Sequence, residues 1–164
     1  MKYTKDKYFW GILRLMMGWT FLWSFLTHTF GLGFDVSSQK SWINGNSPTF
    51  GFLKFGTKGY FADFYQSLAG NPVVDWVFMI GMLLIGLALL LGIGVRIAGY
   101  FGALFFVLIY TASFMPPDNN PFLDQHIYYI VLLIAFAFVD AGQYFGLGGR
   151  WSQTKLVQKF PFLK

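Results

Sequence analysis

A carboxylate and an imidazole lie two residues apart in the stretch NNPFLDQHIYY, residues 119–129, where Asp124 precedes His126. Five apolar residues follow at positions 130–134, so the pair stands at the start of a hydrophobic helix. An imidazole titrates near neutral pH and relays protons, and a neighbouring carboxylate fixes its tautomer. We therefore take His126 and Asp124 as candidate catalytic residues. The alternative is structural: Asp124 caps the helix, and His126 is an interfacial residue wetted by lipid headgroups.

Three further side chains are expected at the membrane level of His126, namely His28, Asp75 and Trp76, because each lies near the outer boundary of an apolar segment. Such a group among aromatic residues suits a quinone, whose carbonyls need hydrogen bonds and whose reduction needs two protons. With Arg14, which shares a helical face with His28, they form a candidate quinone site. Asp75 has the alternative of capping its own helix. Haem ligation by the two histidines is disfavoured, because no second feature of the sequence supports haem.

Two charged residues fall inside apolar segments, Arg14 in the first and Asp140 in the last. Charges within a bilayer are unfavourable and usually face the protein interior, where they find partners. Both residues lie about six positions from the same predicted membrane face, so we expect a structural ion pair between them. Two alternatives remain for Arg14, which are contact with a lipid phosphate and a role in a proton or quinone path.

The composition identifies the solvent of this chain. Of its 164 residues 55% are hydrophobic, 22% are aromatic and only 12% are charged. A soluble domain carries about 25% charged residues, so the protein is expected to lie in lipid. Cysteine and glutamate are absent and histidine occurs twice, which excludes disulfides, iron–sulphur clusters and zinc–thiolate sites and leaves no metal site expected. The net charge of +5 indicates cationic membrane flanks rather than a nucleic-acid partner.

Four apolar segments are long enough to cross a bilayer and make a single membrane domain, residues 1–164. They cover approximately residues 8–31, 74–94, 97–115 and 127–147. We expect an all-α integral membrane protein, a four-helix bundle. The tight turn at residues 94–96 predicts that the second and third segments form an antiparallel hairpin. Small residues on both segments predict close helix packing: Gly81, Gly86, Ala98, Gly99, Gly102 and Ala103.

The distribution of Lys and Arg predicts the orientation. Eight lie on the side of both termini and three in the connection between the first two segments, so both termini are expected in the cytoplasm. That outer connection, residues 34–72, is too polar to span and rich in aromatic residues. It predicts one or two short interfacial helices, or alternatively a cap that binds a partner.

An ordered set of motifs resembles the DoxX-like membrane family, most closely the DoxD-type subunit of thiosulfate:quinone oxidoreductase. The motifs are RLMMGWTFLW, NSPTFGFL, NPVVDW, GMLLIGLALLLGIGVRIAG and NPFLDQHIYY, spread over residues 11–151. The resemblance implies a four-helix bundle in a prokaryotic plasma membrane. It also implies electron transfer from a sulphur compound to quinone, and a DoxA-type second subunit. Without cysteine, thiosulfate would bind non-covalently or react on the partner.

Two functions follow as hypotheses. The first is a quinone-reactive subunit of a membrane oxidoreductase, in which His126 and Asp124 handle the quinol protons. The second is a non-catalytic accessory or assembly subunit of a larger respiratory or oxidase complex. A transporter lacks support, because the sequence has no inverted repeat and no interrupted span with charge at its centre.

Overall fold

The computed structural model describes residues 5–113, 115, 117, 120 and 122–164. All regular structure in these residues is helical, apart from one isolated bridge between Leu32 and Ser37. The elements are, in order, α1 (Lys5–Phe30), η1 (Ser38–Lys40), η2 (Trp42–Asn44), η3 (Phe52–Gly56), α2 (Ala62–Ser67), α3 (Pro72–Leu91), α4 (Val95–Ser113), α5 (Gln125–Phe138), η4 (Ala141–Gln143), α6 (Gly148–Trp151), α7 (Lys155–Lys159) and η5 (Pro161–Leu163).

Three helices, α1, α3 and α4, are long and apolar enough to cross a membrane. Each begins and ends within three residues of the bounds that the sequence predicts, so the all-α class and these three segments are confirmed. In lipid, a single apolar run can satisfy its backbone polar groups only by forming a helix. The length of each run therefore predicted the helix.

The fourth predicted helix ends early. The prediction ran to residue 147, but α5 stops at Phe138 after 14 residues, which is about 21 Å of helix against a hydrocarbon core of about 30 Å. Asp140 adopts a left-handed backbone with φ of 47°, which an α-helix cannot continue through. Four glycines among residues 142–149 then favour turns over a helix. The predicted end at 147 is therefore wrong.

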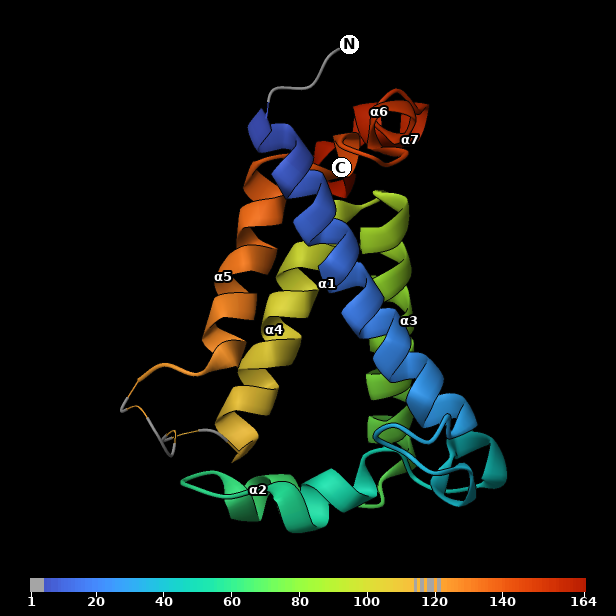
Figure 1. Cartoon of the computed structure of the whole chain (residues 1–164), viewed down its shortest axis with the longest axis vertical. Coiled ribbons are helices and arrows are strands. Elements are labelled where there is room, and N and C mark those ends of the chain that lie inside the picture. Colours follow the sequence, from blue (N-terminus) through green and yellow to red (C-terminus); the bar gives the residue numbers. More distant parts are fainter. Residues whose placement is uncertain (1–4, 114, 116, 118–119, 121) are drawn as a thin grey trace.

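The helices form two packed pairs (Figure 1). α1 lies along α3, and α4 lies along α5, with the short turn between α3 and α4 joining the pairs. The start of α1 and residues 141–164 lie at one end of the molecule, which we call the terminal end. The connection of residues 32–71 covers the opposite end, which we call the loop end.

Glycines set how closely the helices approach. A Cβ added at Gly99 of α4 would lie 2.5 Å from the Leu133 carbonyl oxygen of α5, and one at Gly86 of α3 would lie 2.8 Å from the Leu22 amide nitrogen of α1. These two glycines therefore bring the helices of each pair into backbone contact, which confirms the predicted close packing, but against α1 and α5 rather than within the α3–α4 hairpin. Gly81 was predicted to serve the same purpose, but a Cβ there would meet nothing within 4 Å.

Large apolar side chains cover the outward faces of the long helices. They include Val77, Leu84, Phe101 and Val131, each at least 60% exposed. The interior is a cluster of methionine, phenylalanine, leucine and alanine side chains shared by α1, α3, α4 and α5. Lipid chains cover such an apolar surface favourably, whereas its exposure to water is unfavourable.

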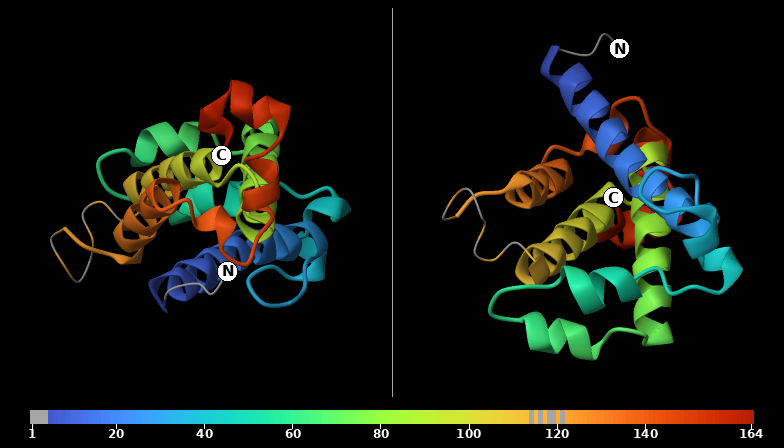
Figure 2. Two further views of the ribbon diagram at one scale, coloured as in Figure 1. Left: turned by 90° about the horizontal axis from the view of Figure 1, so that it is seen from above. Right: turned by 60° about the horizontal axis from the view of Figure 1, so that its bottom comes forward.

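The connection of residues 32–71 is fastened to the ends of two long helices. Its Lys58 amide donates to the Ala112 carbonyl of α4 at 3.0 Å, and the Ser113 hydroxyl donates to the Gly56 carbonyl at 2.7 Å. Figure 2 shows α2 and the turn before it crossing the loop end between α4 and α3. The segment is therefore a folded cover rather than a free linker.

Candidate functional site

Asp124 caps α5 and also contacts the ring of His126. It is the N-cap of α5: its Oδ1 accepts from the His126 amide at 3.0 Å. Its Oδ2 lies 2.5 Å from Nδ1 of the His126 ring. Because the carboxylate is fixed by the cap, it holds the imidazole in one orientation and favours a proton on Nδ1.

The His126 ring is enclosed by protein. The residue is 6% exposed, and its ring centroid lies 5.7 Å from that of Phe106 on α4 and 6.4 Å from that of Tyr129 on α5. The alternative of a histidine wetted by headgroups is therefore wrong. A buried imidazole beside a carboxylate and two aromatic rings is a group that can exchange a proton in a water-poor setting.

His28 does not join this pair. Its Nδ1 lies 2.8 Å from the Ser24 carbonyl oxygen one turn earlier in α1, and its ring packs against Phe78 at 5.8 Å. The ring contacts that connect the two histidines pass through three phenylalanines: Phe78, Phe105 and Phe106. The described contacts of His28 therefore do not include Asp124 or His126.

Asp75 holds the cover in place instead of capping α3. The N-cap of α3 is Asn71, whose side chain accepts from the Val73 amide at 2.9 Å. Asp75 is 7% exposed, and its Oδ1 accepts from the Ser47 hydroxyl at 2.8 Å, the Thr49 hydroxyl at 2.5 Å and the Thr49 amide at 3.2 Å. The capping prediction for Asp75 is wrong, because the carboxylate lies one turn too far into the helix.

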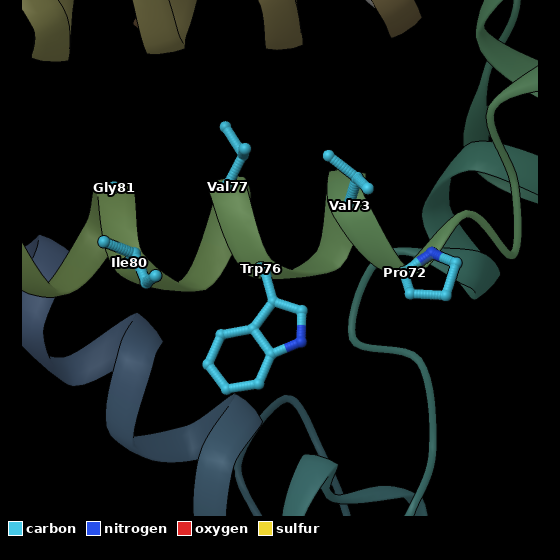
Figure 3. A pocket seen from close by; sticks show the side chains of 6 residues that line it. All are labelled: Pro72, Val73, Trp76, Val77, Ile80 and Gly81. Atoms are coloured by element: carbon cyan, nitrogen blue, oxygen red, sulfur yellow. The ribbon is translucent and has the colours of Figure 1, made fainter.

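Trp76, next to Asp75, faces the surface. It is 56% exposed and packs its ring on Trp42 with the centroids 4.6 Å apart. Trp76 also lines a shallow groove of about 450 Å³ on α3, together with Pro72, Val73, Val77, Ile80 and Gly81. In Figure 3, Val73 and Val77 project to one side of α3 and Trp76 to the other, beside α1. Neither Asp124 nor His126 lines the groove, so the groove lies apart from that pair.

Arg14 is fully buried, at 0% exposure, and binds carbonyl oxygens. Its guanidinium donates to Ala141, Leu90, Tyr144 and Phe145 at 3.1, 3.1, 2.7 and 3.1 Å, and also to Leu89. Two of these carbonyls belong to the last turn of α3, where the helix leaves them without an internal partner. The guanidinium supplies five N–H donors in one plane, which matches this ring of acceptors.

The predicted ion pair between Arg14 and Asp140 is wrong. Asp140 lies instead 3.5 Å from Arg96 and 3.4 Å from the Lys164 ammonium, half-exposed at the terminal end. Because α5 ends at Phe138, the backbone that follows turns its carbonyls toward Arg14 while the Asp140 side chain points elsewhere. The end of the helix, rather than a carboxylate, satisfies the buried cation.

Within the part of the chain that the structure describes, no three His or Asp side chains gather as a metal site would require. The quinone candidates do not converge on one site: Arg14 lies at the terminal end, whereas on α3 the Asp75 side chain binds the cover and Trp76 faces the groove. The sequence did not indicate Phe106 and Tyr129 as neighbours of His126. The antiparallel α4–α5 hairpin was the signal that could have found them, since it places the end of α4 beside the start of α5.

Comparison with family models, with curated proteins and with solved structures finds no match to this chain.

Proposed function

We propose that this chain is the membrane subunit of a quinone-linked redox complex, in which the Asp124–His126 pair exchanges protons with a quinone headgroup. The observation that carries the proposal is the 2.5 Å contact between Asp124 and a buried His126 at the start of an apolar helix. Reduction of a quinone to a quinol consumes two electrons and two protons. An imidazole backed by a carboxylate is a group that can donate a proton to a quinone oxygen.

The electrons enter from another subunit under this proposal. The chain has no cysteine, so it offers no thiolate for an iron–sulphur cluster and cannot form a persulfide. A DoxA-type partner, which the family resemblance implies, would oxidise the sulphur compound and deliver the electrons. The role left to this chain is to bind the quinone and deliver the protons.

The proposed setting is a prokaryotic plasma membrane, with the terminal end in the cytoplasm. Support comes from the eight Lys and Arg residues assigned to the terminal side against three in the connection at the loop end. With this orientation the cover of residues 32–71 lies at the outer surface, with its short helices in the interface, and α5 serves as a fourth crossing completed by flanking residues. The Asp124–His126 pair then exchanges protons on the outer side.

The test is quinone reduction by the full complex in native membranes with thiosulfate as the donor. His126→Gln removes the proton carrier and is expected to lower turnover about 100-fold, a usual value for loss of a general acid–base group. Asp124→Ser retains a helix cap but loses the carboxylate, so it should lower turnover less and shift its pH profile. Gln125→Ala changes an exposed neighbour on the same turn and should leave turnover unchanged. A folded His126→Gln protein with normal turnover would refute the proposal.

A second function, a non-catalytic accessory or assembly subunit of a larger respiratory complex, has its own supporting observation. The cover exposes large aromatic side chains, with Phe55 at 79%, Tyr60 at 80% and Phe64 at 61% exposure. Exposed aromatic residues are typical of the centres of protein interfaces. This function predicts that the double variant Phe55→Ser/Tyr60→Ser loses copurifying subunits in mild detergent. It also predicts that His126→Gln retains them and keeps the activity of the complex.

A further inference from the structure

The carboxy-terminal segment, residues 148–164, carries a one-sided charge. Its four cations are Arg150, Lys155, Lys159 and Lys164, and no acidic residue occurs anywhere between positions 141 and 164. Among the described residues, only Lys164 of these four lies within ion-pair distance of a carboxylate, which is that of Asp140. The other three cations are exposed and remain available to an external anion.

Backbone contacts fix this segment at the ends of the long helices. The Leu147 amide donates to the Leu91 carbonyl at the end of α3 at 2.8 Å, and the Arg96 amide of α4 donates to the Lys164 oxygen at 2.8 Å. The left panel of Figure 2 shows the segment lying over this end of the molecule. Since α3 and α4 are two of the three helices long and apolar enough to cross a membrane, we expect the segment to lie where hydrocarbon gives way to headgroups.

The outer face of the segment combines cations with apolar side chains. Leu156 is 50%, Phe160 41% and Phe162 58% exposed, whereas Val157 is 2% exposed and packs inward. The Lys159 ammonium lies 5.5 Å from the centre of the Phe160 ring, and the rings of Phe160 and Phe162 are 6.1 Å apart. Apolar rings beside flexible cationic side chains are the composition of elements that lie in the membrane interface.

We infer that residues 148–164 form a lipid-binding anchor, in which Arg150, Lys155 and Lys159 bind the phosphate headgroups of anionic phospholipids while Phe160 and Phe162 enter the acyl boundary. A soluble phosphate would use the cations but gain nothing from the exposed rings. An acidic protein would not require the segment to be held at the depth of the helix ends. The inference does not depend on the redox proposal.

The test measures which lipids the full chain retains. Protein in mild detergent is equilibrated with equal amounts of phosphatidylglycerol and phosphatidylcholine, and bound lipids are quantified by mass spectrometry. The native chain should prefer the anionic lipid, and Lys155→Gln/Lys159→Gln should lower that preference by about fivefold or more, given the usual contribution of a cation near an anionic surface. The control variant Lys40→Gln/Lys54→Gln removes two exposed cations at the loop end and should leave the preference for the anionic lipid unchanged.

Three outcomes would overturn the inference. The first is an equal preference for phosphatidylglycerol in the native chain and the Lys155→Gln/Lys159→Gln variant, and the second is an equal loss of that preference in the loop-end control. The third is displacement of phosphatidylglycerol by millimolar glycerol phosphate. The last would identify a soluble phosphate site.

A second measurement covers the case in which the charge variant fails to fold. Because the chain has no cysteine, Gln158→Cys accepts a single polarity-sensitive fluorophore on α7. The label should report an apolar setting in vesicles that contain phosphatidylglycerol and lose that signal at high salt. A signal that does not depend on the anionic lipid would contradict the anchor.

Discussion

Arg14 at the terminal end and the Asp124–His126 pair at the loop end are both buried polar groups on apolar helices, but they are satisfied in different ways. Arg14 is surrounded by five backbone carbonyls, which neither titrate nor move independently of the fold. His126 contacts a carboxylate that also caps its helix, so its partner is an acidic side chain rather than the backbone. A cation held by backbone dipoles stabilises one structure, whereas an acid–base pair can pass a proton on. The comparison therefore sets a structural contact at the terminal end against the pair at the loop end for which we propose proton transfer.

The largest expected effect tests the terminal end. Arg14→Met leaves five backbone carbonyls without this donor, and the contacts to Leu89 and Ala141 are buried, so the free energy of unfolding should fall by roughly 3–5 kcal/mol. Arg14→Lys keeps the charge but supplies fewer donors and should recover only part of the loss. The measurement is thermal unfolding in detergent, followed by circular dichroism.

Thr20→Val is the matched control for Arg14, because Thr20 lies on the same helix, is exposed and bonds only within its own turn. It should change stability little. If the Arg14→Met variant has the same unfolding temperature as the native chain, the carbonyls find other donors. The guanidinium would then not hold the terminal end together.

An intermediate effect is expected for the cover at the loop end. Asp75→Ala removes the acceptor of two hydroxyls and one amide, with an expected cost of about 2–3 kcal/mol to the cover, which should detach locally. Trypsin should then cleave faster after Lys54 and Lys58, with less change in the unfolding of the whole bundle. Asp75→Asn keeps an acceptor oxygen and should restore part of the protection.

Asn71→Ala is the control for Asp75. It removes the N-cap of α3, at a cost of about 1 kcal/mol, but leaves the contacts of Ser47 and Thr49 with Asp75 intact. Equal cleavage rates in the Asn71 and Asp75 variants would mean that the carboxylate does not hold the cover.

The smallest effect should come from Asp140, the residue that the sequence paired with Arg14. Its contacts with Arg96 and Lys164 are long and half-exposed, so Asp140→Asn should cost at most about 1 kcal/mol. The loss should shrink further in high salt, since exposed pairs are screened. The measurement is the same thermal unfolding. A loss of unfolding free energy as large as that of Arg14→Met would show that the contacts of Asp140 are essential to the fold.

The outcome of the sequence predictions follows the range of the interactions involved. The cap at Asp124 and its contact with His126 are local, within one helical turn, and were predicted. The partners of Arg14 were missed because they are backbone carbonyls 75 to 131 residues away, and any residue type supplies a carbonyl. The end of α5 was missed because the apolar run continues past Phe138 while the backbone at Asp140 does not.

By itself, the sequence determined the class of this protein and the three long helices. Apolar length and the absence of alternative backbone partners in lipid leave no other structure for such runs. It also placed an acid–base pair at a helix start. Tertiary structure alone decided which charges meet, that Arg14 binds backbone carbonyls, that Asp75 secures the cover, and that aromatic rings enclose His126. These outcomes depend on how the helices end and cross, because a charge is satisfied by whichever dipoles the packing brings within reach.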